Sequence, residues 1–355
     1  MSTPSLPAFL SQSKTDVHAK FIDLEWQQRN RLLAGAQASS NPDQPSQWAR
    51  LTGEAVAARN RYVNVEPFAQ NRVRLNVAEG VSDYINASPI QLGKRRYIAT
   101  QGPKNTNLNH FYRMVNAEVR GRAVVVMLTQ THESGREKCF QYYPLSSEES
   151  PLQIPPDHES GDGFQGTVEL TSIEDDEPTR TQIRQLQLRT ETGNSALPPQ
   201  EQEIYHLLFS GWPDFLVPEG DDRAALTRLI QLSAQLNSKP SDPSATHTNG
   251  AAAADFADSE QDNPRIIHCS AGVGRSGTFI ALDYLLSLLY SGQLDNVPPE
   301  KDPIMETVDA LRQQRMMMVQ GEGQFHFVYE TLKEAFIQRA NGGSPDAIGG
   351  AESGA

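Results

Sequence analysis

The residue types that could do chemistry gather in one stretch, residues 266–286, which reads IIHCSAGVGRSGTFIALDYLL. An apolar run ends at Cys269, five residues follow, and Arg275 precedes a second apolar segment. Small residues between a strand and a helix let successive N–H groups point into one hollow, which suits an anion. The Arg275 guanidinium matches two oxygens of a phosphate. The stretch therefore predicts a phosphate-binding loop.

Cys269 lies in the electropositive part of this loop, so its thiol should ionise readily. Cysteines in such surroundings have pKa values of about 3.5–7.5, against about 8.5 for a free cysteine. The thiolate could attack phosphorus while Arg275 and the loop amides hold the other oxygens, and Ser276 could donate a hydrogen bond to the sulfur. The amides expected to hold those oxygens belong to Ser270, Ala271, Gly272, Val273 and Gly274.

The loop admits two other interpretations. A strand, turn and helix can enclose a cysteine that is simply part of the core, but the two glycines, Ser276 and the preceding His268 favour a functional loop. A nucleotide-binding P-loop needs a lysine after its second glycine, and residues 269–275 contain none.

The motif HCSAGVGRSGT resembles the signature of the cysteine-dependent protein tyrosine phosphatases, and the resemblance extends from about residue 55 to 335. It implies a non-receptor, tyrosine-specific enzyme without metal or cofactor. It also implies an α+β fold of the three-layer α/β/α type: one catalytic domain with a central twisted mixed sheet, flanking helices, and the phosphate-binding loop between a strand and a helix.

The segment SGWPDFLVPEG is similar to the mobile Trp-Pro-Asp loop of that family. The resemblance makes Asp214 the general acid for the leaving tyrosine oxygen and then the general base for water. Phe215 would contact the substrate, and Trp212 would anchor the loop. Leu216 stands where the family often has glycine.

Three further segments resemble family loops that line the site. In NRYVNVEPF, Tyr62 would stack on the phosphotyrosine ring and make the pocket too deep for phosphoserine, and Asn64 would contact the peptide backbone. In MMMVQGEGQFHFVY, Gln320 would orient the hydrolytic water, with Gln324 beside the substrate. In ESGREKCFQYYP, Glu133 would pair with Arg275, Lys138 would lie at the pocket mouth, and Cys139 would be in the core. His268 of the signature and Arg315 would support the loop.

Composition limits the other classes of function. The chain has 355 residues, of which 37% are hydrophobic, enough for a globular body with a core. Its net charge of -13 makes it a poor general binder of nucleic acid or of an anionic membrane. Two cysteines exclude a disulfide scaffold or a cysteine-rich zinc site. We find neither a signal peptide nor an apolar run long enough for a membrane span, and expect a cytoplasmic monomer.

Hydrophobic periodicity and turn residues predict how the chain is organised. We expect a flexible tail over 1–15, a catalytic domain over 16–340 with a disordered insertion at about 237–264, and a flexible tail over 341–355. Helices are predicted at 16–34, 46–58, 222–236, 275–290, 302–315 and 324–339, with another beginning near 110. Strands are predicted at 123–130, 164–173, 179–190, 203–210 and 265–268, and a long loop at 145–162.

The sequence as a whole predicts a protein tyrosine phosphatase in signal transduction that acts on phosphotyrosine proteins. Two alternatives stay open. One is a dual-specificity or phosphoinositide phosphatase, and the other is a non-enzymatic phosphotyrosine-binding module built on the same fold.

Overall fold

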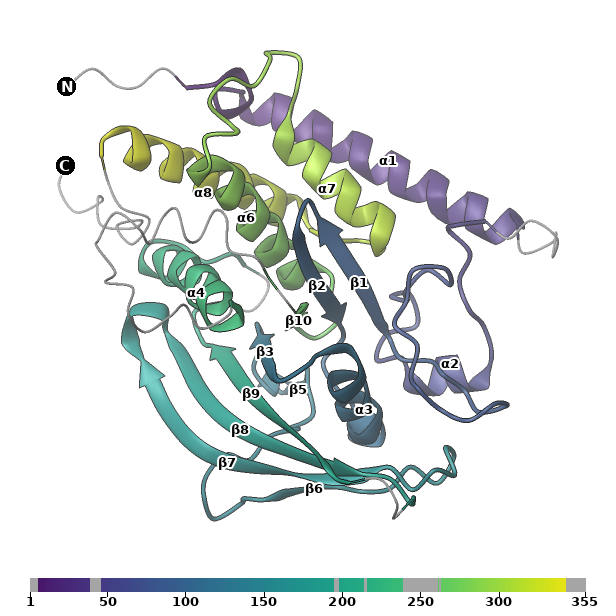
Figure 1. Cartoon of the computed structure of the whole chain (residues 1–355). Coiled ribbons are helices and arrows are strands. Elements are labelled where there is room, and N and C mark those ends of the chain that lie inside the picture. Colours follow the sequence, from purple (N-terminus) through teal and green to yellow (C-terminus); the bar gives the residue numbers. More distant parts are fainter. Residues whose placement is uncertain are drawn as a thin grey trace.

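The computed structural model describes residues 6–38, 46–194, 198–213, 216–238, 261 and 263–342. Within them, eight strands form one twisted mixed sheet in the order β1-β2-β10-β3-β9-β8-β7-β6 (Figure 1). The strands are β1 Ala87–Leu92, β2 Arg95–Thr100, β3 Arg122–Met127, β6 Leu152–Ile154, β7 Gln165–Asp176, β8 Thr181–Glu191, β9 Gln200–Phe209 and β10 Arg265–His268. A small hairpin pairs β4 His132–Glu133 with β5 Arg136–Glu137.

The central strands β2, β10, β3 and β9 run parallel, and the outer strands pair antiparallel. Helices cover both faces: α3 Leu108–Glu118 lies on one, and α4 Asp221–Asn237 and α6 Gly274–Tyr290 lie on the other (Figure 1). Outside α6 lie α1 Lys14–Ala38, α7 Pro303–Gln314 and α8 Glu322–Ala340. The remaining helices are α2 Glu54–Arg59 and the short 3-10 turns η1 Ala8–Leu10, η2 Asn105–Asn107 and η3 Glu177–Thr179.

Strand β3 shows why the sheet is covered on both sides. From Ala123 to Met127 its residues are apolar without alternation, as expected for a strand buried on both faces. Val124 and Val126 pack into the core below α4 and α6, whereas Val125 and Met127 pack against α3. The predicted α+β fold with a mixed sheet between helical layers is therefore confirmed.

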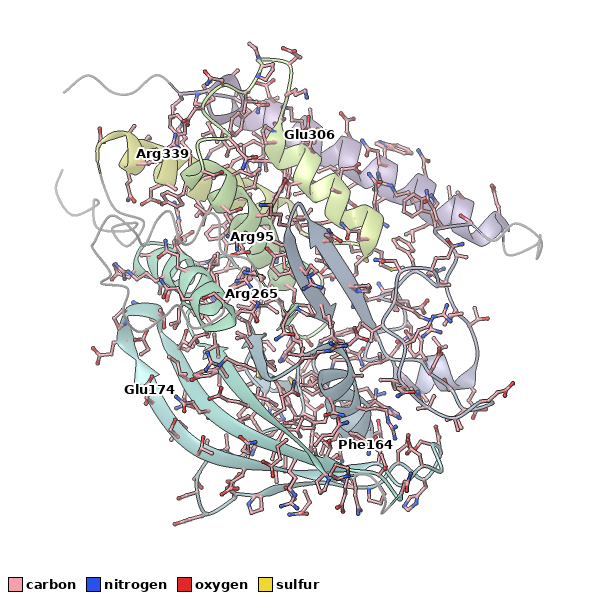
Figure 2. All side chains as sticks on the ribbon, viewed as in Figure 1. Arg95, Phe164, Glu174, Arg265, Glu306 and Arg339 are labelled. Carbon is pink, nitrogen blue, oxygen red and sulfur yellow. The ribbon has the colours of Figure 1, made fainter. Side chains whose placement is uncertain are left out.

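A buried group of charges joins α6 to the sheet. Asp283 of α6 accepts from Arg95 of β2, at 3.0 Å, and from Arg265 of β10. Both arginines lie near the centre of the molecule between α6 and the sheet (Figure 2). All three side chains are almost fully buried, so the Asp283 carboxylate partly compensates the two guanidinium charges where water cannot.

Several predicted boundaries change in the structure. The expected helix over 46–58 is wrong in its first half: Ala49 is tied to Ala69, Trp48 packs on Phe68 at 5.3 Å, and the helix starts only after Gly53, whose φ is +122°. The expected tail over 1–15 is also too long, since Phe9 and Leu10 are buried in the core. Within the long loop predicted at 145–162, residues 152–154 form β6.

The predicted insertion at 237–264 falls largely outside the described residues, which resume at Gln261 and Asn263. At its two ends, Ser238 forms a β-bridge with Gln261, and Asn263 donates to the backbone of Arg120 and Arg122. Every helix in the described ranges is too short or too polar to cross a lipid bilayer.

Candidate active site

The site forms where the four parallel strands end. Because parallel strands have their carboxyl ends at one edge of the sheet, the segments that follow them meet there. Strand β10 leads directly into Cys269 and β2 into Gln101. Strand β3 leads to Thr129 and Glu133, and β9 leads to Trp212. Of these residues, Cys269 and Glu133 line one hollow of about 590 Å³.

The loop between β10 and α6 curls as its small residues predict. Gly272 has φ +71°, and a Cβ there would lie 2.1 Å from the Thr100 carbonyl oxygen, so only glycine fits. The buried Arg315 holds the outer side of the loop: Nε donates to the Gly272 carbonyl at 2.9 Å and Nη2 to the Ala271 carbonyl at 3.1 Å. With these carbonyls held outward, the loop N–H groups are free to face the hollow.

Cys269 lies at the floor of the hollow and is only 5% exposed. Burial alone would raise the pKa of its thiol, but several groups together lower that pKa below its ordinary value. They are the hydroxyl and N–H of Ser276, the Arg275 charge and the Gly272 N–H, which lies 3.3 Å from Sγ. The buried Ser276 hydroxyl has no oxygen or nitrogen partner in the described part of the chain. The site thus favours a thiolate.

Arg275 is held in one orientation by a carboxylate. Its Nη1 and Nη2 donate to the two oxygens of Glu133, at 2.5 and 3.0 Å, and Nη1 also donates to the Leu128 carbonyl at 3.0 Å. Glu133 is in turn fixed by the Thr129 hydroxyl at 2.9 Å. A guanidinium held in this way keeps a defined direction, which suits a bidentate contact with phosphate.

Two buried residues that the sequence did not single out support the loop through His268. Burial lowers the pKa of His268 to about 4, so the imidazole is neutral at pH 7. Its Nδ1 lies 3.2 Å from the Cys269 carbonyl and its Nε2 lies 2.6 Å from the Tyr142 hydroxyl. His206 Nε2 lies 2.9 Å from the same hydroxyl. These contacts fit one chain of hydrogen bonds. His206 donates to the Tyr142 hydroxyl, which donates to His268, and His268 donates to the Cys269 carbonyl.

The mouth of the hollow is lined by Tyr62, Asn64 and Lys138. The Tyr62 hydroxyl lies 2.7 Å from the Ser270 hydroxyl, which donates to the Lys138 carbonyl at 2.9 Å. These bonds place the Tyr62 ring beside the Cys269 loop, although its side chain is more than one-third exposed. A flat aromatic wall of this kind can hold a ring over the cysteine.

Two glutamines also line the hollow. Gln320 is exposed and faces the hollow, whereas Gln324 accepts from the Gly321 N–H at 3.3 Å. The Gln324 amide lies against Gly274, where a Cβ would come within 3.0 Å of it. Gln324 is therefore packed on the loop, and Gln320 is the one that is open to solvent.

The predicted site residues on the β9 side are only partly described. Asp214 and Phe215 lie outside the described residues. Trp212 is buried, and its Nε1 donates to the Leu216 carbonyl at 3.0 Å. Leu216 lines the hollow, with its side chain 66% exposed. Val273 and Ser276 lie buried behind the hollow, and Cys139 is part of the core, where burial raises its pKa.

Comparisons with known proteins agree on one family. A family model described as protein-tyrosine phosphatase matches residues 57–334. Tyrosine-protein phosphatase 1 of Saccharomyces cerevisiae is 32% identical over 360 residues, covering 92% of this chain and 96% of that protein. Tyrosine-protein phosphatase 2 of Schizosaccharomyces pombe is also 32% identical and covers 94% of this chain, but this chain spans only 41% of that longer relative.

Solved structures show the same fold. The catalytic domain of human protein tyrosine phosphatase non-receptor type 18 superposes with a TM-score of 0.64 at 26% identity, covering 91% of this chain and 96% of that chain. A structure of the same protein in complex with HER2 phosphopeptides gives a TM-score of 0.66, at 92% and 94% coverage. Because the family model matches most of its 355 residues, this chain belongs to the protein-tyrosine phosphatase family of hydrolases.

Proposed function

We propose that this protein removes phosphate from phosphotyrosine in other proteins through a phosphocysteine intermediate. In the first step, the Cys269 thiolate forms a bond to phosphorus as the bond from phosphorus to the tyrosine oxygen breaks, and Asp214 gives that oxygen a proton. In the second step, a water oriented by Gln320 attacks phosphorus. The sulfur–phosphorus bond breaks, the thiolate is restored, and Asp214 takes the proton of the water.

One observation carries this function: Cys269 lies in a hollow where the Gly272 N–H donates to its sulfur at 3.3 Å and Glu133 orients the neighbouring Arg275. These groups also lower the pKa of the thiol. A thiolate is a nucleophile at neutral pH, and the guanidinium and loop amides supply donors for the charge that gathers on the phosphoryl oxygens. Asp214 is assigned from its place between Pro213 and Phe215 in the WPDF motif. Its role rests on the resemblance and on the need of the tyrosine oxygen for a proton.

Tyr62 supports a preference for phosphotyrosine. Its ring stands beside the cysteine loop, so a substrate must reach past it to bring phosphorus to Sγ. A phosphotyrosine side chain is long enough to do so, and its ring can stack on Tyr62, whereas phosphoserine is shorter. The structural relative that binds HER2 phosphopeptides supports a peptide substrate of the same class.

A panel of substrates tests the function. We expect release of phosphate from phosphotyrosine peptides in the presence of chelator, with little from phosphoserine peptides or phosphoinositides. Equal rates on phosphotyrosine and phosphoserine would favour the dual-specificity alternative. Tight binding of a phosphotyrosine peptide with no phosphate release by the wild-type protein would favour the binding module.

Two variants separate the assigned roles. Cys269→Ser should abolish turnover, because a hydroxyl does not ionise in this site. Asp214→Ala should slow turnover by about 10²–10⁴-fold while peptide binding is largely kept. Wild-type rates in both variants would overturn the mechanism.

We also propose a cytoplasmic location and a monomeric state. Cys139 and Cys269 are both free thiols, and the thiolate chemistry needs a reducing compartment. Cell fractionation tests the location, and sedimentation tests the monomer.

A further inference from the structure

The turn that carries Gln320 has a backbone that is costly to form. Met317 and Val319 have φ values of +60° and +55°, a left-handed conformation that residues other than glycine seldom adopt. Val319 is also β-branched, which makes this conformation rarer still. Such a turn keeps its shape only when surrounding contacts hold it.

One set of contacts comes from the catalytic loop and α7. The Val319 N–H donates to the Val273 carbonyl at 3.2 Å. The buried Arg312 of α7 donates from Nε to the Met318 carbonyl at 3.0 Å and from Nη2 to the Val319 carbonyl at 2.9 Å. Arg312 thus holds the two carbonyls that immediately precede Gln320.

A second set of contacts comes from helix α1, which lies beside α7 (Figure 1) and precedes the region matched by the family model. Three residues spaced along one face of α1 make them. Gln28 Oε1 accepts from the Met317 N–H at 3.1 Å, and Glu25 pairs with Arg312 Nη1 at 2.8 Å. The Phe21 ring lies under the Arg312 guanidinium at 5.5 Å.

The Gln28 contact has the character of a specific support. Gln28 is only 5% exposed, and its Nε2 is buried without a partner in the described ranges, so the amide is used through its oxygen alone. Burial of the unpaired Nε2 costs free energy, and the hydrogen bond accepted by Oε1 offsets only part of that cost. That bond goes to Met317, the first residue of the turn with a left-handed backbone.

From this geometry we propose that Gln28 and Glu25 of α1 are positioning residues for Gln320 and act on the second chemical step. Attack of Cys269 on phosphorus does not use the water-orienting amide, so a loosened turn leaves the first step intact. Hydrolysis needs the water held in line with the sulfur–phosphorus bond, so the same loosening slows the second step. Since this rests on the proposed function, wild-type phosphocysteine formation has to be established first.

Rapid-mixing kinetics with a chromogenic aryl phosphate and with a phosphotyrosine peptide test the role. In Gln28→Ala we expect the burst of released phenol to keep the wild-type rate constant, while steady-state kcat falls about 3- to 10-fold. KM should fall by the same factor, leaving kcat/KM unchanged, because kcat/KM reports only steps up to phenol release. Glu25→Gln should act in the same direction and serves as the second variant if Gln28→Ala folds poorly.

Two comparisons isolate the effect. Gln28→Glu keeps the oxygen that accepts from the Met317 N–H, so its kcat should be close to that of the wild type and above that of Gln28→Ala. Lys20→Ala removes another ion pair of α1, with Asp302 at 2.6 Å, that does not touch the Gln320 turn, and should keep wild-type kinetics. The idea is overturned if Gln28→Ala matches the wild type, matches Lys20→Ala, or lowers kcat/KM as much as kcat. If the wild-type protein itself shows no burst and no turnover, it is the proposed function that fails.

Discussion

The two terminal nitrogens of Arg275 donate to the two carboxylate oxygens of Glu133, at 2.5 and 3.0 Å. This bidentate contact uses one edge of the guanidinium and fixes the direction in which the group faces. Both side chains are nearly buried, so the orientation is not averaged by solvent. Glu133 comes from the β4–β5 hairpin, 142 residues before Arg275 in sequence.

Replacement of Glu133 by Gln should therefore lower kcat/KM for a phosphotyrosine peptide by about 10²-fold, the usual effect of a misplaced catalytic group. The reason is that a neutral amide no longer fixes both nitrogens of Arg275. Steady-state kinetics measure the change. Glu137→Gln is the control, because Glu137 lies on the same hairpin and pairs with Arg61 instead. Equal losses in the two variants would contradict a specific role for Glu133.

Gly272→Ala should disrupt the phosphate-binding loop. The left-handed backbone alone costs about 1–2 kcal/mol for an alanine, and the added Cβ would also meet the Thr100 carbonyl oxygen at 2.1 Å. We expect loss of phosphate release and a lower melting temperature. Gly121→Ala is a matched control, since Gly121 has φ +73° with no atom near the added Cβ. An active Gly272→Ala enzyme would show that the loop does not need this geometry.

Ser276→Ala should raise the pKa of Cys269, because it removes a hydroxyl donor that favours the thiolate. The measurement is inactivation by iodoacetate across pH. In the wild type, the rate should rise with pH and level off below the range of a free cysteine. In Ser276→Ala the midpoint should move to higher pH, so that alkylation is several-fold slower at acidic pH but similar on the plateau. Ser291→Ala, near the exposed end of α6, should leave the curve in place.

Acid should destabilise the fold through His268. Its pKa is about 4 in the folded protein because of burial, against about 6.5 in an unfolded chain. Between these values the unfolded state binds a proton and the folded state does not, so the free energy of unfolding falls as pH falls. The loss from pH 7 to pH 5 is about 2 kcal/mol for this residue. His206, whose burial also lowers its pKa, adds a loss of the same sign.

Urea unfolding at pH 7, 6 and 5 measures this slope. His268→Gln should flatten it, whatever its effect on stability at pH 7. His158→Gln, at an exposed histidine, is the control that shows how much of any change comes from replacing a histidine as such. A His268→Gln protein with the wild-type slope would mean that this imidazole takes up its proton at the same pH in the folded and unfolded states, against the pKa lowered by burial.

The catalytic loop was predictable because its parts are adjacent in sequence. Cys269, the glycines, Arg275 and the helix that follows form one local unit, and their spacing alone indicates an anion site. The position of the sheet between two helical layers was also predictable, since the apolar run in β3 is typical of a strand covered on both faces.

Long-range contacts were not accessible from the sequence. Tyr142, His206 and His268 come from three separate segments, and nothing in their local sequence shows that their polar atoms meet. The first half of the helix expected over 46–58 is wrong for a similar reason. Trp48 packs on Phe68, which is distant in sequence, and the helix begins only after Gly53. The left-handed backbone of Val319 could not be predicted either, because valine rarely adopts this conformation.

The most direct test is to stop the reaction with acid within the first turnover and map the phosphate by mass spectrometry. The proposed mechanism predicts phosphate on the peptide that contains Cys269, formed from a phosphotyrosine peptide, accumulating in Gln320→Ala and absent in Cys269→Ser. Steady phosphate release with no phosphorylated Cys269 at any time in the wild type or Gln320→Ala would contradict it.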